Sequence, residues 1–600
     1  MFYTMKENMK NLLFLMGILG VSLFAEAKEY HVSVKGNDSN AGTVNAPFRT
    51  IQHAAEIAYP GDVITVHEGT YRERVDPVRG GEENRPIVYQ AAEGETVEIK
   101  GSEVLNDWVG ENENAWFVKI PNTFWQDFNP YADTLHGDWL TSGKWCHTGE
   151  VYLNGKALRE TASLEQLLAQ KGDTAFWHSQ IVGDTTVIWG NFKSDPNKET
   201  VEINTRQSVF YPSKPYINYI HVRGFVMSHA ATPWAPPTAE QIGLVGTHWS
   251  KGWVIENNKI SYSKCVGITL GKYGDEWDNK SESAEAFVKT TERACENNWD
   301  EEHIGSHIVR NNRISDCGQA GIAGSLGAIF SMVEGNRIFD IARHQQFWGL
   351  ELAGIKFHAP VDVVIRKNHI YRTEGGIWLD WMTQGTRITG NVLHDNKVQD
   401  FSLEVNHGPI LVDNNLFLSK ELGQVKLSQG IAFVNNIIAW KIWETPLVDK
   451  RETPYLSLHG TSIAGFHDCP CGDVTYYNNI FTRADLTSYD ACKLPVRMDG
   501  NIFLSGAKPS VKERNPYVND PFDPDVRIIE QSDGWYLQMN VLKEWLDKIK
   551  SKKYTSGDLE QTVISGQTFD RESGDVIPLY PGVIDQLQEG VVSIKVFAND

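Results

Sequence analysis

Apolar residues occupy alternate positions in two neighbouring stretches of the chain that share one pattern. Residues 377–381 read Ile-Trp-Leu-Asp-Trp, and residues 401–405 read Phe-Ser-Leu-Glu-Val. Alternation of this kind is the period of a β-strand with one face in a core. Ile377, Leu379 and Trp381 therefore face the core. Asp380 and Glu404 hold the same place, on the outward faces of two strands, at positions 24 residues apart.

A phrase ending in asparagine marks the period of a longer repeat. An Asn-Asn, Gly-Asn or Lys-Asn step followed by apolar residues recurs, and its second asparagine is Asn258, Asn312, Asn336, Asn368, Asn391, Asn415, Asn436, Asn479 or Asn501. Five of the intervals fall between 21 and 24 residues, and the longer ones indicate insertions. This period predicts an all-β fold, a right-handed parallel β-helix with one coil per repeat. Asparagine suits the corner because it tolerates the left-handed backbone region and can hydrogen-bond a neighbouring coil. An array of hairpins, as in a propeller, is the alternative, but its repeats are nearly twice as long.

The predicted coils bring the two acids together. Equal positions in adjacent coils lie about 4.7–4.9 Å apart. Retaining glycosidases place their two carboxyl groups about 5–5.5 Å apart, whereas inverting enzymes need about 6.5–9.5 Å. Like charges opposite each other on strands are unfavourable, so the pair Asp380 and Glu404 indicates a site rather than two surface acids that stack by chance.

The neighbouring coils add further candidates to the same outward face. If Ile355 and Phe357 face the core, Lys356 and His358 point outward beside Asp380, although the strict spacing then requires a one-residue bulge. Lys426 takes the equivalent place beside Glu404. Each candidate has a plain structural reading as a packing residue or a surface charge. The expected binding residues are Glu351, Lys356, His358, Trp378, Asn406, His407 and Lys426.

The remaining sequence divides around these coils. We expect a signal peptide over residues 1–27, an N-terminal cap and the first coils over 28–104, an inserted β-sandwich-like domain over 105–205, the β-helix with the candidate site over 206–505, and a tail packed on it over 506–600. Two excursions, 271–303 with a helix over 284–293, and 441–474, should help to build the binding face. Trp139 and Trp145 are expected in the core of the insert, with a position in the pocket as the alternative.

The N-terminus has the pattern of a secretory signal. Lys6 and Lys10 precede an apolar run over residues 12–24, and Ala25-Glu26-Ala27 follows as a cleavage site. The run is shorter than the roughly 18 residues of a membrane span, so we expect an exported protein with no membrane anchor in its mature form.

The net charge and the cysteines of the chain limit the classes of ligand that we expect it to bind. The net charge of -21 argues against nucleic acid and, weakly, against a polyanionic substrate such as pectin. Seven cysteines at irregular spacing give no disulfide framework, although a bridge of Cys295 or a Cys469–Cys471 bridge is compatible with export. Cys469-Pro-Cys471 is too tight for a usual metal knuckle, and we expect neither a metal nor a cofactor.

The N-terminal cap, the early β insertion and the motif Trp-Leu-Asp-Trp…Ser-Leu-Glu-Val-Asn-His-Gly-Pro resemble glycoside hydrolase family 120, a family of β-xylosidases. The resemblance implies a β-helix interrupted by a β-sandwich and a retaining mechanism, with Asp380 as nucleophile and Glu404 as acid/base. It also implies an exo-acting enzyme that releases xylose from an oligosaccharide substrate. The sequence allows a homo-oligomer.

Other functions remain compatible with the coils. A polysaccharide lyase would need a calcium cluster of acids and a basic residue acting on a uronate, and two acids are few for that. An inverting polygalacturonase would need a wider arrangement of acids. A non-catalytic glycan-binding β-helix would lose no chemistry when Asp380 is changed.

Overall fold

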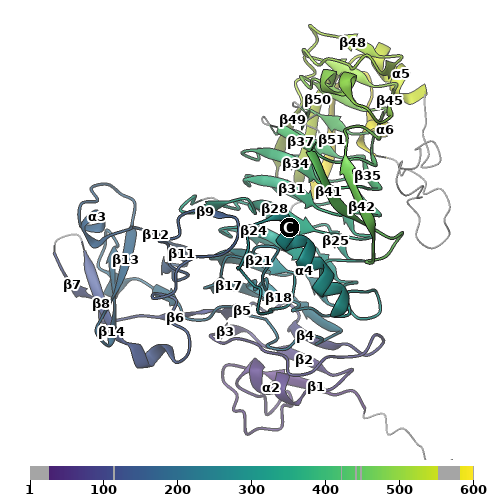
Figure 1. Ribbon diagram of the computed structural model, residues 1–600. Coiled ribbons are helices and arrows are strands. Elements are labelled where there is room, and N and C mark those ends of the chain that lie inside the picture. The colour runs from purple at the N-terminus through teal and green to yellow at the C-terminus, as the bar shows by residue number, and fades with distance from the viewer. Residues whose placement is uncertain are drawn as a thin grey trace, which may run out of the picture.

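The computed structural model describes residues 26–112, 115–342, 344–419, 422–439, 442–445, 449–551 and 582–598. Residues 1–25, which hold most of the expected signal peptide, lie outside this range. Two long parallel sheets run along all the coils, and a third, shorter parallel sheet covers the middle coils (Figure 1). The predicted parallel β-helix is confirmed.

The strands of the three sheets pair in sequence order, coil after coil. The 14-stranded sheet contains β1 (Glu29–Val32), β2 (Val63–Val66), β4 (Ile87–Ala91), β16 (Ile220–Arg223), β19 (Val254–Glu256), β22 (Ile308–Arg310), β25 (Met332–Glu334), β29 (Val364–Arg366), β32 (Thr386–Thr389), β35 (Ile410–Asp413), β38 (Ile431–Val434), β43 (Val474–Tyr477), β45 (Val496–Asp499) and β47 (Glu513–Arg514). The 13-stranded sheet contains β3 (Gly69–Tyr71), β5 (Val97–Lys100), β17 (Val226–Ala230), β20 (Lys259–Ser263), β23 (Arg313–Ser315), β26 (Arg337–Phe339), β30 (His369–Tyr371), β33 (Val392–His394), β36 (Leu416–Phe417), β39 (Ile437–Ile438), β44 (Ile480–Thr482), β46 (Ile502–Leu504) and β48 (Tyr517–Asn519). The 8-stranded sheet contains β18 (Val245–Gly246), β21 (Val266–Thr269), β24 (Ala320–Ser325), β28 (Ala353–His358), β31 (Gly375–Asp380), β34 (Gln399–Glu404), β37 (Leu422–Lys426) and β40 (Ile442–Thr445).

An asparagine ladder stands at the corner between the 14-stranded and the 13-stranded sheets. The Asn391 Oδ1 atom accepts hydrogen bonds from the backbone N and the Nδ2 of Asn368, at 2.9 and 3.0 Å. The Asn391 Nδ2 donates to the carbonyl of Ile365 at 2.9 Å. The same contacts link all nine predicted asparagines in order. The left-handed backbone belongs to the residue before each ladder asparagine, for example Lys367 with φ of 53° and Asn414 with φ of 58°. Two residues therefore share the roles that the sequence assigned to one.

The core of the coils is continuous and apolar. Ile377, Leu379, Phe401 and Leu403 are buried in one cluster that extends from the first coil to the last ones. The helix α2 (Ile51–Ile57) covers the first coil and contributes Ile51, Ala54 and Ala55 to this core. Thr50 caps it, because its hydroxyl accepts a hydrogen bond from the backbone N of His53 at 3.2 Å. A helix in this place protects the open edge of the first coil.

The insert stands beside the coils as two mainly antiparallel sheets with their own core (Figure 1). One sheet contains β6 (Ser102–Val104), β10 (Val151–Leu153), β11 (Lys156–Ala157) and β15 (Val201–Asn204); the other contains β7 (Val109–Gly110), β8 (Trp116–Pro121), β12 (Arg159–Glu160), β13 (Phe176–Val182) and β14 (Thr185–Asn191). The short elements η1 (Asn122–Trp125), α3 (Leu164–Leu168) and η2 (Pro196–Lys198) complete it. Its core includes Trp108, Trp125 and Trp177. The expectation for Trp145 is wrong, since its side chain is 43% exposed. Trp139 lies outside that core cluster too. It directly precedes strand β9 (Leu140–Ser142), which pairs with β27 (Trp348–Gly349) of the β-helix region.

Two excursions and a C-terminal unit pack around the coils. The first excursion carries α4 (Ala284–Glu296), and the second is the hairpin of β41 (Asp449–Leu456) and β42 (Ile463–Cys469). The C-terminal unit combines an antiparallel sheet with α5 (Lys543–Ser551) and α6 (Val583–Gln586), and it packs on outward residues of the 13-stranded sheet. Its strands are β49 (Arg527–Gln531), β50 (Gly534–Val541) and β51 (Gly590–Ala598). None of the helices in the described ranges is both long and apolar enough to cross a bilayer.

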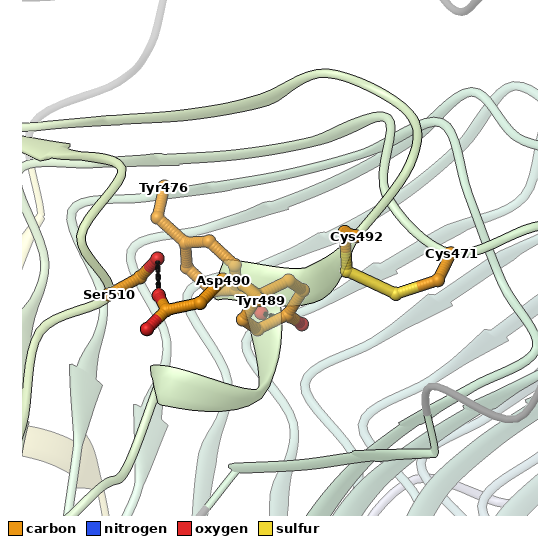
Figure 2. The surroundings of a disulfide bond; sticks show 6 residues. All are labelled: Cys471, Tyr476, Tyr489, Asp490, Cys492 and Ser510. Atoms are coloured by element: carbon orange, nitrogen blue, oxygen red, sulfur yellow. Dashed lines mark hydrogen bonds between the residues drawn. A yellow bond between two sulfur atoms is a disulfide. The ribbon is translucent and has the colours of Figure 1, made fainter.

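One disulfide joins Cys471 to Cys492, whose Cα atoms lie 5.1 Å apart. It ties the turn after β42 to the end of η3 (Thr487–Ala491), next to Tyr476 and Tyr489 (Figure 2). The considered Cys469–Cys471 pairing is wrong: Cys469 is buried against Val405, on the side facing the coils. The considered bridge of Cys295 is wrong as well, because this thiol is free and exposed.

Candidate active site

Four consecutive strands of the 8-stranded sheet align the candidate residues. Within β28, β31, β34 and β37, His358 pairs with Asp380, Asp380 with Glu404, and Glu404 with Lys426. The predicted stacking of the two acids on adjacent coils is confirmed. β28 and β31 pair without a register shift, so the predicted bulge is absent. The extra residue lies instead in the turn that follows, because β29 pairs Val364 with Arg387.

These strands form the floor of a cavity of about 340 Å³. Its walls come from distant parts of the chain: the insert, the segment before β28, α4 and the hairpin. The lining residues are Trp139, Pro237, Ala284, Phe287, Leu350, Glu351, His358, Trp378, Asp380, Trp381, Glu404, Val405, Gln424, Lys426 and Arg451. Segments far apart in the sequence thus close over one outward face, which is why so many outward residues there are buried.

The two carboxylate oxygens of Asp380 differ, because one is hydrogen-bonded and the other is unpaired. Its Oδ2 lies 2.8 Å from the Nζ of Lys356 and 3.3 Å from the Nε2 of His358. Its Oδ1 is buried and has no hydrogen-bond partner among the described residues. Burial alone would raise the pKa of Asp380, but Lys356, and then His358, outweigh burial and hold this pKa well below its usual range. Asp380 is therefore an ionised carboxylate with one unshared oxygen.

Glu351 and His358 sit at the closed end of the cavity. Burial, reinforced by the charges of Asp380 and Glu404 and opposed by Lys356, raises the pKa of Glu351 to about 8. Burial and the charge of Lys356 lower the pKa of His358 to about 4, although Asp380 opposes them. At neutral pH Glu351 is thus mainly protonated and His358 is neutral. This end of the cavity offers a hydrogen-bond donor on a carboxylic acid.

Glu404 and Lys426 form the more open end. The Nζ of Lys426 lies 2.6 Å from the Oε1 of Glu404, and the two side chains are 36% and 17% exposed. Between the ends, the ring of Trp378 faces the cavity, with the Nζ of Lys356 3.3 Å from its centroid. A cation against a half-buried indole is stabilising and helps to hold the ring in place.

Asn406 and His407 serve the scaffold, and neither belongs to the lining. The Oδ1 of Asn406 accepts from the backbone N of Thr383 at 3.0 Å, and its Nδ2 donates to the carbonyl of Leu379 at 3.2 Å. The Nε2 of His407 lies 2.8 Å from the hydroxyl of Thr453. The chain turns at Val405, where φ is 56°, and carries both side chains away from the cavity.

Several lining residues were not expected from the sequence. Trp381 was assigned to the inward face, but β31 ends before it, φ is 48° there, and the ring lines the cavity. Phe287 of α4 packs against it, with ring centroids 5.7 Å apart. Ser402 pairs with Trp378 on one side and with Gln424 on the other, so Gln424 lies on the same outward face as Trp378. Strand alternation therefore predicts this position for Gln424. Arg451 had no sequence signal, and Trp139 takes the alternative considered for it, a position in the cavity.

Metal binding finds no support in the described part of the chain, where no three His, Cys, Asp or Glu side chains are grouped closely enough to hold an ion. The cavity therefore combines an ionised carboxylate on Asp380, a second carboxyl group one coil away on Glu404, a protonated acid on Glu351, and aromatic walls.

Comparison with known proteins gives a consistent result. Residues 105–203 match the family described as glycoside hydrolase 120, insertion domain, residues 242–438 match the right-handed beta helix region, and residues 34–91 match a family of unknown function. A solved structure of XylC with xylose is 38% identical, with a TM-score of 0.90, and the alignment covers 95% of this chain and 100% of that one. The predicted right-handed coil and the inserted domain are confirmed.

Other similarities are partial. A lacto-N-biosidase from Eubacterium ramulus aligns over 86% of this chain and 71% of its own, at 12% identity and a TM-score of 0.38. Among curated proteins, the uncharacterized protein YwoF of Bacillus subtilis is 42% identical over 76 residues, and the pectate lyase PEL9 of Emericella nidulans is 38% identical over 80 residues. These two matches span 16% and 20% of the respective proteins and 13% of this chain.

The electrostatics of Asp380 can be tested directly. Lys356→Met should raise the pKa of Asp380, because Lys356 is the largest influence that lowers it. A carboxyl ¹³C NMR titration would follow the change, and Lys259→Met, at an exposed position of β20, is the control. An unchanged titration of Asp380 in Lys356→Met would contradict this assignment.

Proposed function

Because the chain belongs to glycoside hydrolase family 120, we propose that it is a retaining β-xylosidase that removes single xylose units from the non-reducing ends of xylo-oligosaccharides. The observation that carries the proposal is the pairing of Asp380 with Glu404 on adjacent strands within one cavity. Paired strands lie about 4.7–4.9 Å apart, close to the separation of about 5–5.5 Å that retaining enzymes use.

In the first step, we assign Asp380 as the nucleophile. Its open Oδ1 attacks the anomeric carbon, while Lys356 and His358 hold Oδ2 and stabilise the ionised form. Glu404 gives its proton to the glycosidic oxygen as the bond to the leaving sugar breaks. The result is a xylosyl ester on Asp380, a free alcohol on the leaving group and an ionised Glu404.

In the second step, Glu404 acts as the base. It removes a proton from a water molecule, whose oxygen attacks the anomeric carbon as the bond to Asp380 breaks. Asp380 leaves as a carboxylate, for which its low pKa suits it, and Glu404 regains its proton. Two displacements at the same carbon return the β-configuration.

The closed end of the cavity supports the removal of one terminal sugar. Protonated Glu351 is positioned to donate a hydrogen bond to a sugar hydroxyl, and Trp378 and Trp139 supply aromatic faces. The insert and α4 contribute walls on this side, so a chain end fits better than the middle of a polymer. A lyase would need a cation site, for which the described residues supply no cluster.

Export is part of the proposal and rests on the pattern of residues 6–27. The mature protein, isolated from outside the cytoplasm, should begin within a few residues of Lys28 when its N-terminus is sequenced. Mature protein that still begins at Met1 would exclude cleavage of the signal.

Product analysis tests the mechanism. Xylobiose and longer xylo-oligosaccharides should yield xylose as the first product, and ¹H NMR of the nascent sugar should show the β-anomer, because two inversions occur. Initial α-xylose would exclude retention, and early mixed oligosaccharides would exclude exo action.

Variants test the two roles. Glu404→Ala should lose about 10²–10⁴-fold on xylobiose, the usual contribution of proton transfer. It should keep much of the first step on an activated aryl β-xyloside, and azide should restore turnover as a β-glycosyl azide. Asp380→Ala removes the nucleophile, so its loss should be larger and no leaving group should repair it.

The exposed Glu83→Ala variant is the matched control and should keep wild-type activity. The assignment of roles is reversed if azide rescues Asp380→Ala as an α-azide while Glu404→Ala stays inactive on every substrate. Full activity of both variants would place the catalytic site elsewhere.

A further inference from the structure

The two ends of the cavity differ in the charge they offer. Because Glu404 protonates the leaving oxygen, the leaving group must lie on its side, away from Glu351. The coils continue in that direction to β37, where Gln424 and Lys426 line the cavity, and the hairpin strand β41 adds Arg451. The leaving group therefore meets two cationic side chains and one amide.

This cationic edge runs against the composition of the chain, whose net charge is -21. The side chain of Lys426 is 36% exposed and that of Arg451 is exposed, so both can reach a bound molecule. At the closed end, by contrast, the cation Lys356 is buried beneath the cavity, with its Nζ 2.8 Å from the Oδ2 of Asp380. The two ends are thus built for different ligands.

The ion pair between Lys426 and Glu404 sets a requirement on catalysis. The Nζ of Lys426 lies 2.6 Å from the Oε1 of Glu404, the same carboxyl group that must pass a proton to the leaving oxygen in the first step. A negative group on the leaving sugar would attract the Nζ of Lys426 and weaken its contact with Glu404, which leaves this carboxyl group available to the leaving oxygen. The same group would gain charge-assisted hydrogen bonds.

We propose that the leaving-group side of the cavity recognises an anionic sugar: the preferred substrate is a xylo-oligosaccharide in which the xylose next to the scissile bond carries a uronic acid. The uronate carboxylate binds Lys426, with Arg451 beside it, and draws Lys426 away from Glu404. This proposal rests on the proposed β-xylosidase function and names its substrate class.

Two substrates that differ only in charge test the idea. One is xylobiose with a glucuronic acid on O2 of its reducing-end xylose, and the other is its carboxyl-reduced form, which carries glucose. Xylose release from the acidic substrate should have a kcat/KM about tenfold higher at low salt, as expected for a charge-assisted contact that is partly exposed. The advantage should shrink in 0.5 M NaCl, where charges are screened within about 4 Å.

The effect on Glu404 has its own signature. The basic limb of the kcat profile reports the acid in the bound complex, so it should lie at higher pH for the acidic substrate than for the reduced one. Lys426→Met should remove both this difference and most of the preference in kcat/KM. Arg451→Met should reduce the preference, and Lys259→Met, far from the cavity on β20, should retain it.

The outcomes separate this proposal from the proposed function. Release of xylose from both substrates with equal kcat/KM, or a preference for the reduced one, overturns the anionic site and leaves the β-xylosidase assignment standing. A preference that survives Lys426→Met and Arg451→Met overturns it too, because the charge is then read elsewhere. No release of xylose from either substrate or from xylobiose contradicts the function itself.

Discussion

Register between coils is the constraint on which the cavity depends. Side chains alternate with a period of two along a strand, so a slip of one residue would turn Asp380 into the core and Leu379 into the cavity. The asparagine ladder opposes such a slip, because each asparagine bonds the next coil through backbone and side chain at one fixed place in the repeat. A ladder on one side of the coil thereby holds the carboxyl pair on another.

Stacking two carboxyl groups is costly, and the surrounding charges offset that cost unevenly. Asp380 receives a buried lysine, and Glu404 receives a partly exposed one. Glu351 instead takes up a proton, as its pKa of about 8 indicates. Two buried carboxyl groups of one cavity thus differ: the charge of Lys356 keeps Asp380 ionised, and burial keeps Glu351 protonated.

The sequence predicts the parts of the molecule that obey the repeat. The ladder asparagines, the inward residues such as Leu403, and the acid pair follow from period and spacing alone, because every coil must satisfy the same hydrogen bonds. The walls do not follow. Phe287 and Trp139 reach the cavity from excursions whose docking depends on tertiary packing. Trp381 and Asn406 were misplaced because the strands end in turns with left-handed residues, which alternation cannot anticipate.

The walls also explain how one repeated scaffold acquires a specific chemistry. A parallel β-helix presents many equivalent outward positions, and most of them are ordinary surface. Where α4, the insert and the hairpin cover β28 to β37, the same outward positions become buried. Burial raises the pKa of Glu351 and lowers that of His358, whereas Lys356 and His358 hold the pKa of Asp380 low against burial. The covering segments leave Lys426 partly exposed, so its charged side chain stays accessible to solvent. The gradient from closed to open along four strands therefore gives the cavity a direction, from the buried Glu351 and His358 to the accessible Lys426.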